Sequence, residues 1–153
     1  MGERTVRRDE ASVALSPRQR IEAACSGPRR TDVVAGCIDL LAGGDADGWI
    51  VTLLGGPQAI DVVHGEHRTD QSYWLRVWGA RGLLWAWDDA ALDTVCRAMG
   101  DDAWRVREMC CKVVARHRVG DALPAVAELQ TDRVQRVRRA AARAVVMLTE
   151  AGT

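Results

Sequence analysis

The stretch that decides the fold is DRVQRVRRAAARA, residues 132–144. It begins with an Asp, an Arg follows six positions later, and an aliphatic residue stands directly before that Arg. The same pattern occurs 31 and 62 residues earlier, so three copies share one register. Such a spacing is the signature of stacked supersecondary units. The repeated positions are Asp70, Asp101 and Asp132, then Arg76, Arg107 and Arg138, and a further base at Arg81, Lys112 and Arg143.

Each unit is predicted to form a long and a short helix. In the unit that begins at Asp101 or Asp102, an Asp caps the long helix by accepting from its first amides. One apolar stripe then follows helical spacing, at Val106, Met109, Cys110, Val113, Val114 and His117. Gly120 is expected to end this helix. Asp121 is expected to cap the short helix, with Pro124 in its first turn.

A single unit cannot bury its own apolar stripe and therefore cannot fold alone. Stacked units cover one another's stripes, so the whole array folds together. The sequence predicts an all-α protein with regular repeats over residues 57–153. Residues 17–56 read as degenerate or capping helical segments, at Pro17–Cys25, Thr31–Leu41 and Asp47–Leu54. Residues 1–16 have few large apolar side chains and are expected to be a disordered arm.

Charge divides the chain into three parts although its formal net charge is zero. Residues 1–30 hold seven Arg against four acids, residues 31–100 hold four against ten, and residues 101–153 hold ten bases against seven. A neutral total argues against general attraction to polyanions. Basic ends and an acidic middle favour charged partners and leave self-association open.

The repeat resembles the second helix of HEAT repeats, most closely over Asp132 to Ala144. Its 31-residue spacing is similar to the short bacterial HEAT-like repeats named after phycobilisome lyases. The resemblance implies a right-handed, armadillo-like α-solenoid of antiparallel helix pairs, in which the Asp and Arg residues form a ladder between neighbouring units. It also implies a scaffold for protein–protein interaction. The second unit departs from the pattern by its tryptophans and by Gly79 and Gly82.

The face of successive long helices is the predicted binding surface for a protein partner. Its candidate residues are the recurring or neighbouring bases and two tryptophans that would act as anchors. These residues are Trp74, Trp78, Arg81, Lys112, Arg116, Arg139 and Arg143. Trp74, Trp78 and Trp85 are expected to share one side of a helix, and the sequence leaves open whether they are buried or exposed.

Two other functions remain as alternatives. The basic strip suits a nucleic-acid-binding module, and some HEAT-like proteins recognise alkylated DNA with Trp and Asp. The family resemblance alone suggests a lyase-like chaperone for a tetrapyrrole. No nucleophile–base constellation or phosphate loop stands out, so we expect neither an enzyme nor a cofactor. His64 and His67 lack further ligands for a metal site.

The five cysteines lack metal or redox spacing. No apolar stretch is long enough to span a membrane. We therefore expect a reduced, cytoplasmic protein that does not insert into membranes.

Overall fold

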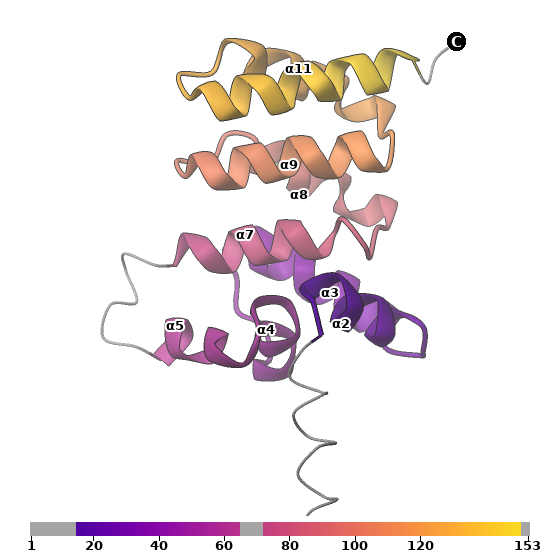
Figure 1. Cartoon of the computed structure of the whole chain (residues 1–153), viewed down its shortest axis with the longest axis vertical. Coiled ribbons are helices and arrows are strands. Elements are labelled where there is room, and N and C mark those ends of the chain that lie inside the picture. The colour runs from indigo at the N-terminus through magenta and orange to yellow at the C-terminus, as the bar shows by residue number, and fades with distance from the viewer. Residues whose placement is uncertain (1–14, 65–71, 151–153) are drawn as a thin grey trace, which may run out of the picture.

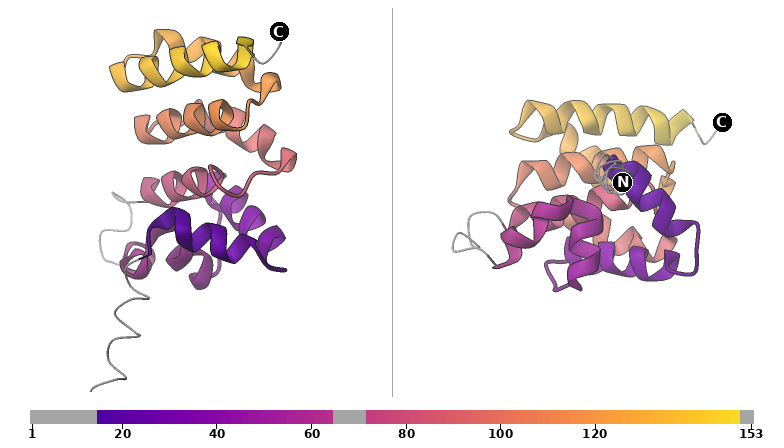
Figure 2. Two further views of the ribbon diagram at one scale, coloured as in Figure 1. Left: turned by 45° about the vertical axis from the view of Figure 1, so that its right-hand side comes forward. Right: turned by 60° about the horizontal axis from the view of Figure 1, so that its bottom comes forward.

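The computed structural model describes residues 15–64 and 72–150, and in these ranges the chain forms helices and no strands. The prediction of an all-α protein is confirmed. The long helix of each regular unit is α7 (Tyr73–Gly82), α9 (Trp104–Arg116) or α11 (Gln135–Glu150). They lie one above another in successive tiers (Figure 1), and the turned views keep the same arrangement (Figure 2).

Short helices complete the upper two tiers. α8 (Leu92–Ala98) packs on α9, and α10 (Leu123–Glu128) packs on α11. Each begins directly after a 3-10 turn, at Asp89–Ala91 and Gly120–Ala122, and a third such turn follows α10 at Leu129–Thr131. The apolar stripe that the sequence predicts for α9 is buried at Val106, Cys110, Val113 and Val114. Burial of such side chains contributes about 25 cal/mol per Å² of apolar surface.

Arginine–aspartate pairs join neighbouring tiers. Arg76 on α7 donates from Nε and Nη2 to the carboxylate of Asp101, over 2.7 and 3.2 Å. Arg107 on α9 does the same to Asp132, over 2.8 and 3.1 Å. Each carboxylate also accepts from the backbone amide two residues later, which belongs to Ala103 or Val134. The Asp therefore orders the start of its own long helix while it binds the Arg of the tier below.

The N-terminal helices close the lower end of the stack. They are α2 (Pro17–Cys25), α3 (Arg30–Leu41), α4 (Gly48–Gly55) and α5 (Ile60–His64). A reciprocal capping box between Ser16 and Gln19 starts α2. α3 packs on α7 as α7 packs on α9. Its close approach requires glycine, because a Cβ at Gly79 would lie 2.7 Å from the carbonyl oxygen of Cys37.

Three expectations about helix ends are wrong. Asp121 does not cap the short helix, because it lies inside the 3-10 turn Gly120–Ala122, and Ala122 precedes α10 without a side-chain cap. α9 ends at Arg116, and Arg118 rather than Gly120 adopts a left-handed conformation, with φ of 50°. Gly120 instead begins the next 3-10 turn. α7 ends at Gly82, so Trp85 lies beyond the helix that carries Trp74 and Trp78.

Asp70, His67 and residues 1–14 lie outside the described residues, as does the expected disordered arm apart from its last two positions. In the described part of the chain no helix combines the length and the apolar character needed to cross a bilayer.

Candidate functional site

A groove extends from the segment that follows α7 across α9 to α11. Its volume is about 500 Å³. Apolar side chains form most of its lining: Leu84, Trp85, Ala115, Ala140 and Met147. The rest of the lining is basic and contains Lys112, Arg116 and Arg143, with no acidic residue. An apolar floor with convergent charges of one sign is typical of a binding surface.

Helical spacing places these three bases together. Lys112 and Arg116 are four residues apart on α9, and Arg143 occupies on α11 the register position of Lys112. All three are exposed. Lys112 Nζ lies 3.2 Å from Oε1 of the mostly buried Glu108, so this ion pair partly compensates the charge of Lys112. Arg116 donates from Nε to the carbonyl oxygen of Leu84 over 2.7 Å, which fixes its stem along the groove wall.

Arg81 shares the register of Lys112 and Arg143 but occupies a different environment. It is half-buried, and its guanidinium donates from Nη2 to the carbonyl oxygen of Leu54 on α4. Its Nε is buried without a hydrogen-bond partner among the described residues. Burial and the nearby Arg20 lower the pKa of Arg81. The N-terminal helices thus take up this base, and it does not reach the groove.

The two predicted tryptophan anchors are half-buried against the protein itself. A Cβ at Gly55 would lie 2.8 Å from the ring of Trp78, so this indole packs on α4. Trp74 lies 5.1 Å from the ring of Tyr73. The guanidinium of Arg105 lies between two indoles, 5.4 Å from that of Trp74 and 4.4 Å from that of Trp104. Trp74 therefore lies where the N-terminal ends of α7 and α9 meet, Trp78 packs on α4, and neither lines the groove.

Arg138 and Arg139 both lie outside the lining of the groove. Arg139 is exposed on α11 but does not line the groove. Arg138, the last Arg of the ladder, donates from Nη1 to the backbone carbonyl of Asp132 over 2.7 Å.

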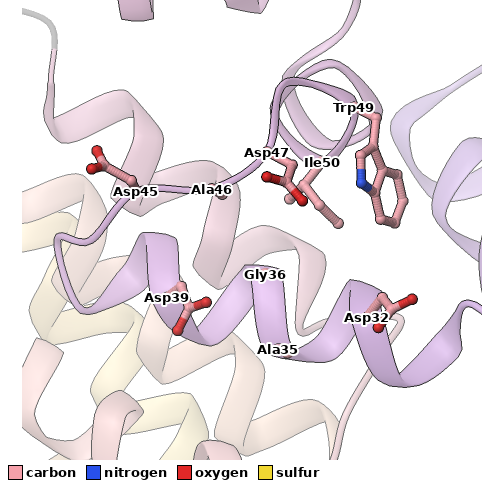
Figure 3. Close-up of a pocket in the computed structure, with 9 residues that line it drawn as sticks. All are labelled: Asp32, Ala35, Gly36, Asp39, Asp45, Ala46, Asp47, Trp49 and Ile50. Carbon is pink, nitrogen blue, oxygen red and sulfur yellow. The ribbon is translucent and has the colours of Figure 1, made fainter.

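A second cavity, of about 460 Å³, has the opposite charge (Figure 3). Asp32 and Asp39 project from α3, and Asp45 and Asp47 come from the segment before α4. Trp49 closes one side. Within the part of the chain that the structure describes, no three His, Cys, Asp or Glu side chains gather closely enough to hold a metal ion. The cavity is thus an acidic surface depression, and it would repel a ligand attracted by the groove.

The cysteines offer no activated thiolate. Burial, with nearby Cys25, raises the pKa of Cys37 to about 12. Burial, with the charges of Asp132 and Glu108, likewise raises that of Cys111 to about 12. A nucleophilic cysteine requires a lowered pKa. Both thiols are therefore core side chains.

The sequence patterns did not predict the apolar lining of the groove, nor Glu108, which pairs with Lys112. Ala140 and Met147 lie three positions before and four after Arg143, which places them on one face of the same helix. This spacing could have identified both residues as neighbours of Arg143 from the sequence alone. No such signal marked Leu84. The sequence singled out Trp85 as one of three tryptophans on one side of a helix, but Trp85 follows the end of α7 and lines the groove instead.

The chain matches a known protein family. Residues 54–146 match a family model described as HEAT repeats. No curated protein and no solved structure matches the chain significantly.

Proposed function

Because the chain belongs to the HEAT-repeat family, we propose that it is a non-enzymatic scaffold that binds a partner protein in the groove between the segment after α7, α9 and α11. The family match supports a role in protein–protein interaction. The partner segment would be acidic and amphipathic. Its apolar side would face Trp85 and Met147, and its carboxylates would meet Lys112 and Arg143.

The observation that carries the proposal is the composition of the groove lining. Three bases surround an apolar floor, and no carboxylate of the lining competes for them. An apolar floor gives affinity through burial, while the charges select the sign of the partner and speed its association. A sequence-independent nucleic-acid surface would need a broader basic area than a neutral chain offers.

The proposal is tested with a fluorescein-labelled helical peptide that carries Leu on one face and Glu on the other. The full chain should bind it, and Arg143→Glu should weaken binding by about tenfold, equivalent to about 1.4 kcal/mol. Arg97→Glu is the matched control, since Arg97 is also exposed but lies on α8 outside the groove lining. Fluorescence anisotropy at low and high salt measures both affinities.

Equal affinity of the two variants for the peptide would contradict the proposal. A duplex DNA of 20 base pairs, titrated in the same way, separates the alternative function. Tighter binding of the duplex than of the acidic peptide, with a steep loss as salt rises, would favour a nucleic-acid-binding module instead.

A further inference from the structure

The outer face of α11 reproduces the surface on which α9 receives α11. On α9 this surface includes Cys111 and Ala115, which are 0% and 7% exposed. The residues 31 positions later are Ala142 and Val146. Ala142 is exposed, and Val146 is 52% exposed, although both are small or aliphatic. Within residues 15–64 and 72–150, no segment covers this strip of α11, which corresponds to the strip that α9 uses to bind its neighbour.

The arginine of this face is already positioned. Arg107 donates from Nη1 to the backbone carbonyl of Asp101 over 2.7 Å, and its Nε and Nη2 bind the next carboxylate. Arg138 makes the same inner contact, to Asp132, also over 2.7 Å. Among residues 15–64 and 72–150 no carboxylate binds Nε or Nη2 of Arg138. The edge of the guanidinium that accepts an aspartate on α9 is thus available on α11, and its stem is fixed.

At one position of this face, the charge on α11 is opposite to the charge on α9. On α9 it is Glu108, which is 8% exposed and whose Oε1 lies 3.3 Å from Nε of Arg136. On α11 the same register position holds Arg139, which is exposed. Arg136 follows Asp132 by four positions. A helix that docked on α11 with a base at that position would be repelled, whereas an acidic residue there would be attracted.

We propose that the outer face of α11 docks a helix of a partner protein that begins with an aspartate and carries a second acidic residue four positions later. The aspartate would order the start of the partner helix and bind Arg138, as Asp132 does for α11 and Arg107. The second carboxylate would meet Arg139. Acidic residues in the first turn also suit the helix dipole. This surface is separate from the groove, so the two proposals fail independently.

The test extends the chain by one unit. A second copy of residues 120–150 is inserted directly after Glu150, which preserves the 31-residue register, and Arg136→Glu is made in the inserted copy only. This chain should melt roughly 5 °C above the parent, because one more tier covers α11. The matched control is the same extension with Arg136 retained, and it should gain less. Arg138→Gln in the original α11 should lower the melting temperature more in the acidic extension than in the parent.

Two results would overturn the proposal. One is an acidic extension that melts no higher than its Arg136 control. The other is an equal effect of Arg138→Gln in the parent and the extension. Sedimentation of the parent chain examines the remaining occupant: a dimer that Val146→Glu dissociates would make a second copy, and not an acidic partner helix, the molecule that covers this face.

Discussion

At the scale of the residue, the connection between tiers depends on an aspartate with two roles. Asp132 accepts from the amide of Val134 over 2.8 Å and from two nitrogens of Arg107. The side chains of the pair are each only 7% exposed. Burial of charges is costly unless their hydrogen bonds are complete, and here the fork of the arginine and the backbone amide complete them. The ladder thus stabilises only when both partners are charged.

Asp132 should make stability depend on pH. Hydrogen bonds from Arg107 lower its pKa from the ordinary value of 3.8, burial opposes this shift, and the amide of Val134 adds to it. A carboxyl whose pKa is lower in the folded state stabilises the fold above the unfolded pKa and loses this contribution as the pH falls through the folded pKa. Asp132→Asn should therefore cost about 2 kcal/mol at pH 7 and less at pH 3, which lies below the unfolded pKa.

Chemical denaturation of both proteins at the two pH values measures this difference. Asp121→Asn serves as control, because Asp121 is exposed and forms no ion pair in the described structure. It should change the free energy of unfolding by less than about 0.5 kcal/mol at either pH. A cost of Asp132→Asn that stays constant from pH 7 to pH 3 would show that its charge does not stabilise the fold.

At the scale of the element, the contact between α3 and α7 depends on glycine. A Cβ at Gly79 would lie 2.7 Å from the carbonyl oxygen of Cys37 and 2.9 Å from the amide nitrogen of Leu41. Both atoms belong to the backbone of α3, so they yield only if the helix moves. Gly79→Ala should cost about 1–3 kcal/mol through overpacking, despite the better helix propensity of alanine. Thermal unfolding measures the cost.

Gly27→Ala is the control for this substitution. No atom lies within 4 Å of a Cβ built at Gly27, and its loop position removes any helix-propensity effect. Its melting temperature should stay within about 2 °C of the wild type. If Gly79→Ala has the same melting temperature as Gly27→Ala, α3 and α7 can move apart without cost, and their contact does not require glycine.

The elements also show what sequence can and cannot predict. The register that repeats every 31 residues predicted α9 and α11, because a local apolar stripe and its neighbours recur together. The turn after α9 was missed because Arg118 adopts the left-handed conformation that usually favours glycine. The glycines of α7 stood out, but their reason lies on α3, about forty residues away in the chain. No local pattern encodes such a partner.

The candidate site follows the same division. Lys112 and Arg143 have the same position in successive repeats, and both line the groove. Residues at the same repeat position on stacked helices lie on the same side of the array. Arg81 has the same register, but its neighbour below is α4 rather than another regular unit, and the carbonyl of Leu54 takes up its guanidinium. Repetition in sequence therefore predicts equivalent surroundings only where both adjacent tiers also repeat.

At the scale of the whole molecule, the tiers form a chain of neighbours. α3 contacts α7, α7 contacts α9 and α9 contacts α11. Each of these contacts therefore joins the helices above it to the rest of the stack. In the described structure α11 has a long helix on one side only. Stability in such arrays is approximately a sum over units and nearest-neighbour interfaces. Loss of one interface should then loosen the end of the stack and leave the opposite end intact.

Arg107→Ala tests this view most directly. It removes both bonds to Asp132 and those to the backbone carbonyls of Asp101 and Asp102, and it leaves a buried carboxylate, at a cost of about 3–5 kcal/mol. Arg105→Ala is the control, because Arg105 only covers the indoles of two tryptophans, a contact worth about 1 kcal/mol each. In hydrogen exchange followed by mass spectrometry, Arg107→Ala should expose the amides of α10 and α11 first, while those of α3 keep their protection. A uniform loss of protection along the chain, or equal melting temperatures of the two variants, would mean that the tiers unfold as one unit and that the ladder does not carry the connection between α9 and α11.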